Sequence, residues 1–116
     1  MSHTMRMEVY NNSQQTLDKC SVTHDWDGHV NSIDCPGLNP KETSKVETIT
    51  SGYTNYDWYN VDVRYSDGTT LVTRFYCNSS YSQDRVQIRV EDGQVCDCIY
   101  FDSGSGSVAT GCYGKG

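Results

Sequence analysis

Residues suited to ligand recognition gather in the run Gly52–Tyr59, where four aromatic rings are interspersed with short polar side chains. Flat aromatic faces pack against the C–H surfaces of sugars, while carboxylates and amides hydrogen-bond to sugar hydroxyls. The same rings are able to hold a choline headgroup by cation–π contact. The alternative is that they cap the end of a thin hydrophobic core. The predicted ligand-binding residues are Trp26, Tyr53, Asn55, Tyr56, Asp57 and Trp58.

A second polar cluster, His24–His29, carries side chains of the types that bind metal ions. Asp25 and Asp27 have oxygens suited to calcium, and histidines suit transition metals. The run lacks the spacing of an EF-hand loop and its closing glutamate. A polar turn in which Gly28 takes a special backbone angle is the simpler interpretation. We therefore predict no metal and no other cofactor, and we expect Trp26 to lie beside the aromatic run and join it in one patch.

The chain lacks the common signatures of catalysis. No G-x-S-x-G or H-E-x-x-H motif is present, and two histidines near aspartates do not define an acid/base pair. With eleven Asp and four Glu, a chance carboxylate pair is expected. The Cys96-x-Cys98 pair has the chemistry of a redox site, but structural pairing fits a cysteine-rich domain better. We predict that the protein is not an enzyme.

Cysteine content points to a disulfide-stapled domain. Six cysteines occur in 116 residues, of which only 35% are hydrophobic. A thin core needs such staples, and zinc sites usually show repeated C-x2-C pairs that are missing here. We expect one disulfide between Cys20 and Cys35 and two more among the remaining four, without choosing their pairing. The predicted disulfide cysteines are Cys20, Cys35, Cys77, Cys96, Cys98 and Cys112.

The disulfides, with two glycosylation sequons at Asn11 and Asn78, predict a secreted, extracellular protein. No apolar run is long enough to span a membrane. The net charge is −6 and the nine cationic side chains are scattered, which argues against nucleic acid and anionic membranes as partners. Residues 1–5 look like an expression-vector remnant, and residues 6–116 fit a single domain.

Period-two alternation bounded by turn residues predicts β-strands throughout, and no window has helical spacing. Two prolines and a glycine make 36–40 a loop. We expect an antiparallel two-sheet β-sandwich of about seven to eight strands, with a small barrel as the alternative. The first four predicted strands are Arg6–Asn12, Thr16–His24, Gly28–Cys35 (with Val30 or Ile33 inward) and Lys45–Thr50 (with Val46 and Ile49 inward).

Two hairpins follow. In the first, a three-residue loop at 66–68 with Gly68 left-handed keeps the faces consistent. Its predicted pairs are Val63 with Leu71 and Tyr59 with Phe75 inside, and Trp58 with Tyr76 and Asn60 with Arg74 outside.

The second predicted hairpin turns at Asp92-Gly93 as a two-residue loop. This register sets Val90 opposite Val95 and Val86 opposite Ile99 on the core side, and it points Cys96 and Cys98 outward. It also turns Asp97 inward, a costly position for a carboxylate, which we attribute to a bulge. Five glycines follow in 103–116, a tail that we expect Cys112 to tie down.

Several short motifs resemble small secreted proteins of the "up-regulated in Daf-two" domain family over about residues 7–90. That resemblance implies a small secreted domain and brings no catalytic or binding residue. In layout the chain is also similar to fungal aegerolysin and actinoporin-like sandwich proteins, which bind lipids or glycans. The motifs are Leu17, Val22-Thr23-His24, Pro40-Lys41-Glu42-Thr43-Ser44, Gly52-Tyr53-Thr54, Asp57-Trp58-Tyr59-Asn60-Val61 and Phe75-Tyr76-Cys77-Asn78.

Three functions stay open at this point. The favoured one is a secreted carbohydrate-binding, lectin-like or surface-recognition domain with a defence or interaction role. The second is a membrane-active cytolysin or toxin component, which would need an exposed apolar rim. The third is a protein-binding effector or inhibitor module, which an exposed and rigid loop at Leu38–Thr43 would favour. The expected partner is thus a glycan or cell-surface ligand, with a lipid headgroup or a protein as alternatives.

Overall fold

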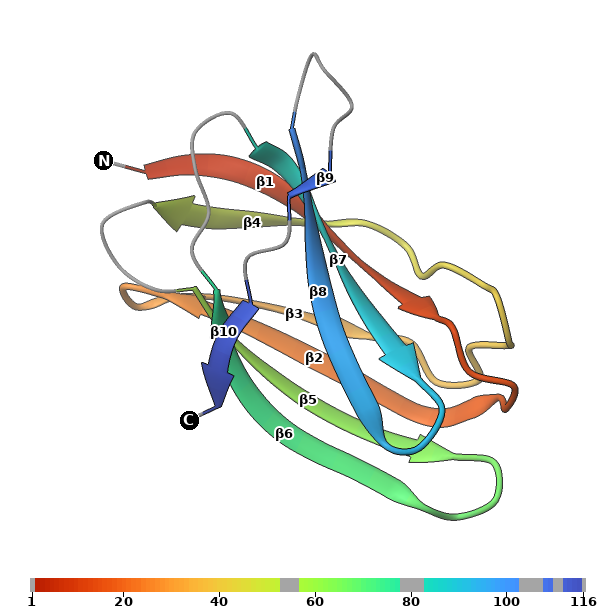
Figure 1. The fold of residues 1–116 in the computed structure, drawn as a ribbon. Coiled ribbons are helices and arrows are strands. Elements are labelled where there is room, and N and C mark those ends of the chain that lie inside the picture. Colours follow the sequence, from red (N-terminus) through yellow and green to blue (C-terminus); the bar gives the residue numbers. More distant parts are fainter. Residues whose placement is uncertain (1, 53–56, 78–82, 103–107, 110–111, 116) are drawn as a thin grey trace.

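Two β-sheets pack face to face in a sandwich (Figure 1). The computed structural model describes residues 2–52, 57–77, 83–102, 108–109 and 112–115. The first sheet runs β4 (Glu47–Gly52), β1 (Ser2–Asn11), β7 (Gln83–Glu91), β8 (Val95–Asp102), and the short β9 (Val108–Ala109) extends it. The second runs β6 (Thr70–Cys77), β5 (Asp57–Tyr65), β2 (Leu17–Trp26), β3 (His29–Asp34), and β10 (Cys112–Lys115) extends it beside β6.

The predicted sandwich is confirmed, but the prediction that it is wholly antiparallel is wrong. Strands β1 and β7 run parallel, from Arg6 opposite Arg85 to Asn11 opposite Val90. A parallel pair needs a long crossover between its strands, and here the second sheet's strands provide it. Pairing between strands so far apart leaves no local signal in the sequence.

The first strand begins earlier than predicted. It starts at Ser2, within the segment that we interpreted as a vector remnant, and Ser2 pairs with Gly52 at the end of β4. Met5 pairs with Ile49, and both side chains are buried in the core. In this fold the segment therefore contributes to the first sheet.

Inward-facing side chains of both sheets form one core, and two hydrogen bonds of tyrosine hydroxyls cross it. The Tyr59 and Tyr100 hydroxyls lie 2.9 Å apart, and the Tyr65 hydroxyl donates to the Glu91 carbonyl at 2.6 Å. Each contact joins one sheet to the other. Several anchors are as predicted: Cys20, Val22, His24, Ile33 and Ile49 are buried, whereas Val30 and Val46 are exposed.

The first hairpin has the predicted register. Val63 pairs with Leu71 and Tyr59 with Phe75, and the Tyr65 amide donates to the Thr69 carbonyl at 2.8 Å to close a three-residue loop. The left-handed residue in that loop is Gly68, with φ of 90°. The outward pairs Trp58 with Tyr76 and Asn60 with Arg74 are confirmed as well.

The second hairpin differs from its prediction by one residue. Glu91 pairs with Val95, so the loop has three residues, and Gln94 takes a left-handed φ of 62°. A one-residue shift exchanges the two faces of a strand. Asp97 is therefore exposed without any bulge, and Cys98 is buried in the core rather than pointing outward. Cys96, the other cysteine expected outside, is half-buried against the same core.

Two pairs of cysteines, Cys20 with Cys35 and Cys77 with Cys98, lie close together without a bond between the two members of the pair. Cys20 and Cys35 are neighbours across β2 and the end of β3, where the Cys35 amide donates to the Cys20 carbonyl at 2.9 Å, but both are free thiols. The Cys77 and Cys98 sulfurs lie 2.7 Å apart, longer than the roughly 2.05 Å of a disulfide. Cys112 pairs with Cys77 through the backbone of β10 and β6. A disulfide between Cys20 and Cys35 stays a prediction.

One predicted glycosylation site is inside the fold. Asn11 is fully buried, and its side-chain amide donates to the carbonyls of Gln15 (2.8 Å) and Leu38 (3.0 Å). Its side-chain oxygen accepts hydrogen bonds from Ser13. The Asn-Asn-Ser triplet thus forms a local side-chain-to-backbone turn, a competing use of the same residues. Asn78 lies outside the described residues.

Candidate ligand-binding face

The outward side of the second sheet carries the candidate site, on strands β2, β5 and β6. Alternation places every second side chain of each strand on this side. In one row Asp25, Trp58 and Tyr76 lie side by side across the three strands, and in the next row Thr23, Asn60 and Arg74 do the same. We call these six residues the Trp58 face.

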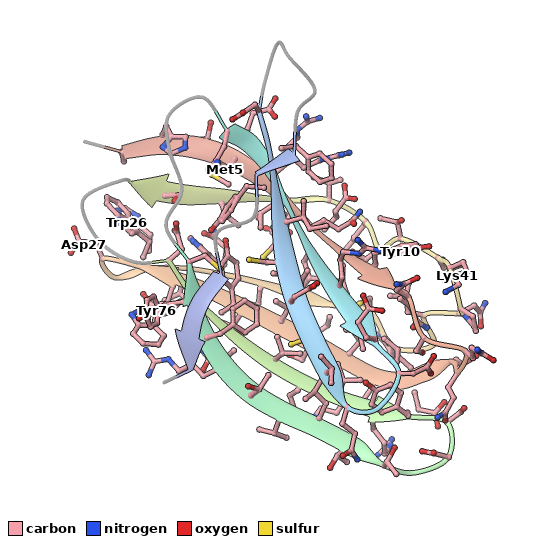
Figure 2. All side chains as sticks on the ribbon, in the orientation of Figure 1. Met5, Tyr10, Trp26, Asp27, Lys41 and Tyr76 are labelled. Atoms are coloured by element: carbon pink, nitrogen blue, oxygen red, sulfur yellow. The ribbon has the colours of Figure 1, made fainter. Side chains whose placement is uncertain are left out.

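Aromatic groups form the centre of the Trp58 face. The Trp58 and Tyr76 rings lie 5.0 Å apart between centroids, tilted by 58°, and the Arg74 Cζ atom lies 4.1 Å from the Trp58 centroid. Trp58 and Tyr76 are half-buried, whereas Arg74 is exposed. Figure 2 shows Tyr76 projecting from β6 away from the other sheet. The three groups form one contiguous cluster at the surface.

Beside this cluster the sheet surface is hollowed. The hollow has a volume of about 560 Å³, and side chains of β2, β5 and β6 line it. Among its lining residues are Ser21, Thr23, Asn60, Asp62, Val72 and Arg74. A shallow depression with both polar and apolar lining, next to aromatic rings, has the composition that a sugar ring requires.

Three polar side chains of the Trp58 face are open to a ligand. Within the described part of the chain, the side chains of Asp25, Asn60 and Arg74 make no hydrogen bond or ion pair. The outward side of the first sheet differs, because there Glu8 accepts a hydrogen bond from Gln87 at 2.7 Å and lies 3.8 Å from Arg85. Glu8, Gln87 and Arg85 thus have partners within the first sheet, whereas Asp25, Asn60 and Arg74 of the Trp58 face have partners still to gain.

The structure separates the predicted ligand-binding residues. Trp58 is at the surface, but its neighbour Asp57 points inward and is fully buried. Trp26 is only 5% exposed and lies against Gly52 at the end of β4 (Figure 2). Side chains alternate between the two sides of a strand. Asp57 and Trp26 therefore point inward, because their neighbours Trp58 and Asp25 point outward. The remaining predicted residues, Tyr53, Asn55 and Tyr56, lie outside the described residues.

The predicted polar turn adopts the expected conformation. Trp26 pairs with His29, and Asp27 (φ 48°) and Gly28 (φ 80°) form the two-residue loop between them. Two positive φ angles are those of a type I′ turn, the form that suits a hairpin. Among the described residues, no three His, Cys, Asp or Glu side chains converge as metal ligands would.

His24 and Asp57 form a buried polar pair behind the Trp58 face. The His24 Nε2 atom lies 2.6 Å from Asp57 Oδ1, and the Ser51 hydroxyl donates to the same oxygen at 2.6 Å. All three side chains are fully buried. Because Ser51 contacts the carboxylate rather than the imidazole, the arrangement does not activate the serine as a nucleophile. The pair instead joins β2 to β5, and the Ser51 contact adds β4.

Sequence reasoning missed five of the six members of the Trp58 face, although the signal for three of them was present. The predicted first hairpin already placed Tyr76 beside Trp58 and Arg74 beside Asn60 on the outer side. The predicted site grouped residues that are close in the chain, whereas a sheet brings together residues from different strands. Asp25 was considered only as a calcium ligand.

No protein-family model matches the chain, and no curated protein matches it. No helix in the described residues is long and apolar enough to cross a membrane. The class that can be stated is therefore that of the fold, an all-β sandwich protein with one mixed sheet.

Proposed function

We propose that this protein is a secreted carbohydrate-binding, lectin-like domain that recognises glycans through the Trp58 face. The observation that carries the proposal is the Trp58–Tyr76 pair, 5.0 Å apart at the surface, beside side chains of Asp25 and Asn60 that have no partner in the described chain. The aromatic pair supplies apolar area for C–H surfaces, and the carboxylate and amide supply acceptors and donors for hydroxyls.

The membrane-active alternative has less support. Among the described residues, the large apolar side chains that are exposed are four valines: Val30, Val46, Val72 and Val95. They lie on β3, before β4, on β6 and on β8. Singly exposed apolar residues are normal on soluble proteins and do not form the rim that insertion requires.

Glycan-array binding of the folded protein, with Trp58→Ala beside the parent, tests the proposal. A matched control is Tyr10→Ala, because Tyr10 also carries an arginine over its ring, with the Arg89 Cζ atom 5.6 Å away, but on the first sheet. We expect selective binding that Trp58→Ala abolishes and Tyr10→Ala preserves. A blank array with protein folded by circular dichroism, or equal loss in both variants, would overturn the proposal.

The Leu38–Thr43 loop supports a second candidate, the protein-binding module. Leu38 is buried and anchors the loop, while the segment from Asn39 to Thr43 is exposed. Backbone hydrogen bonds hold it to the end of β1, where the Lys41 amide donates to the Asn11 carbonyl at 2.7 Å and the Asn11 amide donates to the Glu42 carbonyl at 3.0 Å. A pre-ordered exposed loop loses little entropy on binding a partner.

An inhibition assay tests the inhibitor form of this second candidate. Lys41 is at the exposed turn, with a left-handed φ of 64°, and trypsin-like proteases accept lysine in their specificity pocket. We expect inhibition of such a protease by the parent and by Lys45→Ala, and its loss in Lys41→Ala. Absence of inhibition, or rapid cleavage of the loop, would count against it.

A further inference from the structure

Arg74 and Arg85 make the same kind of contact on opposite sides of the sandwich. The Arg74 Cζ atom lies 4.1 Å from the Trp58 centroid, and the Arg85 Cζ atom lies 3.9 Å from the Phe101 centroid. Arg85 also has a carboxylate neighbour, because its Nη1 atom lies 3.8 Å from Glu8 Oε1. Arg74 has no ion pair or hydrogen bond within the described part of the chain. Of these two arginines, Arg74 is therefore the one without a carboxylate partner among the described residues.

Stacking prepares the Arg74 guanidinium for a planar anion. A guanidinium lying over a ring keeps its N–H groups at its edges, and these match a carboxylate in bidentate geometry. The ring also restricts the side chain, so less entropy is lost when the anion binds. Asn60 lies directly opposite Arg74, and Thr23 opposite Asn60, so further donors lie along the same row.

We propose that the glycan recognised by the Trp58 face carries a carboxylate, as in a sialic or uronic acid, and that Arg74 binds this group. The proposal rests on the proposed carbohydrate-binding function and specifies its ligand class. The adjoining sugar ring would lie in the hollow beside Asn60, with Tyr76 and Trp58 flanking it.

The other charges on this side of the sheet allow an anion at Arg74. Asp62, two residues from Asn60 along β5, is paired with Lys19, whose Nζ atom lies 2.6 Å from Asp62 Oδ2. Asp25 is on β2, two strands from Arg74 on β6. Two strand spacings are roughly 10 Å, beyond the Debye length of about 8 Å at physiological salt. Asp25 is thus free to accept hydroxyls without repelling the carboxylate strongly.

Matched acidic and neutral ligands test this proposal by calorimetry or chemical-shift titration. One pair is sialyllactose and lactose, and the other is an oligogalacturonide and its methyl ester. A hydrogen-bonded carboxylate is expected to strengthen binding roughly tenfold to a hundredfold. Arg74→Gln should remove this preference, whereas Arg64→Gln, an exposed arginine on β5 outside the Trp58 face, should keep it.

The outcomes separate the two proposals. A preference for the acid in either pair, lost only in Arg74→Gln, supports the carboxylate site and identifies the acid. Equal affinity for acidic and neutral glycans, still lost in Trp58→Ala, overturns the carboxylate site and leaves the carbohydrate-binding function standing. Absence of binding to all four ligands and to the array overturns both.

Discussion

Tyr59 and Tyr100 place their hydroxyls 2.9 Å apart in the space between the two sheets, where both side chains are fully buried. Burial raises the pKa of each hydroxyl well above its usual value, so both stay neutral. A buried hydroxyl without a partner costs more than its hydrogen bond contributes when made. The pair therefore favours one particular alignment of the sheets over others that bury the same apolar area.

Tyr100→Phe is expected to lower the free energy of unfolding by about 1–3 kcal/mol, because it removes the bonding partner of the Tyr59 hydroxyl. The double variant Tyr59→Phe/Tyr100→Phe should lose less than the sum of the two single variants, since it leaves no orphaned hydroxyl. Denaturant unfolding of all four proteins measures the coupling. Strictly additive losses would show that the hydroxyls do not interact in solution.

The part of this fold that was predictable is the part with local pairing. The first hairpin follows from alternation alone, because only a loop ending at Gly68 places both Val63 and Leu71 inside. The second hairpin offered two registers. The Asp-Gly sequence favoured the register with a two-residue loop, which is wrong. The three-residue loop of the structure requires Gln94 to adopt a left-handed conformation, which the sequence did not indicate.

Non-local relationships account for most of what sequence reasoning missed. The parallel pairing of β1 with β7 joins segments separated by most of the chain. Asn11 looked like a glycosylation site, but its role is set by the Leu38 carbonyl, which arrives from a distant loop. The candidate site shows the same limit for Asp25 and Thr23, which come from the distant strand β2, whereas the neighbours from β6 belong to the predicted first hairpin.

Gly52 leaves space for the Trp26 ring, which a larger residue at position 52 would occupy. A methyl group at this position would overlap the six-membered ring of Trp26. We expect Gly52→Ala to lower the free energy of unfolding by about 1–3 kcal/mol, typical of overpacking. In a Trp26→Leu background the same change should cost much less, because the ring is gone. An equal cost in both backgrounds, measured by thermal or denaturant unfolding, would contradict this packing.

Removing one partner of the buried His24–Asp57 pair should be more damaging than removing both. Asp57→Ala takes the acceptor from His24 and Ser51 and is expected to cost about 3–5 kcal/mol, the usual range for breaking a buried pair. The double variant His24→Leu/Asp57→Leu should recover part of that loss, since apolar replacement of a buried pair is often nearly neutral. A double variant less stable than Asp57→Ala would argue against this.

The Cys20–Cys35 neighbours predict a specific thiol chemistry. A hydrogen bond from the Cys20 thiol lowers the pKa of Cys35, and the same contact together with burial raises the pKa of Cys20. In reduced protein we expect iodoacetamide to modify the half-exposed Cys35 first, at a pH below that of an ordinary thiol. Cys20→Ala should move this reaction to higher pH. An unchanged pH profile would show that Cys20 does not hold the thiolate.

Oxidation of Cys20 and Cys35 tests the predicted disulfide between them. Because the two residues lie opposite each other across antiparallel strands, mild oxidation should join Cys20 to Cys35. Peptide mapping without reduction identifies the bond, and the bond should add roughly 2–4 kcal/mol to the free energy of unfolding. Recovery of Cys35 bonded to one of the other four cysteines would contradict the pairing.

Tyr65 predicts how stability depends on alkaline pH. Burial, with smaller effects of Cys96 and Asp92, raises its pKa from 10.0 to about 12. The folded state therefore favours the neutral phenol, and the resulting stability is fully present below pH 10 and is lost as the pH rises towards 12. At pH 9 Tyr65→Phe should be less stable than the parent by about 1 kcal/mol, because it lacks the hydrogen bond to the Glu91 carbonyl.

Between pH 10 and pH 11.5 that difference between the parent and Tyr65→Phe should shrink, because only the parent has this phenol to ionise on unfolding. The change is limited to about 1.4 kcal/mol per pH unit, the value for one proton. Other tyrosines with a raised pKa, such as Tyr59 and Tyr100, contribute equally to the pH dependence of both proteins and cancel in the comparison. Denaturant curves that stay parallel across this range would mean that the Tyr65 phenol ionises as readily in the folded chain as in the unfolded one.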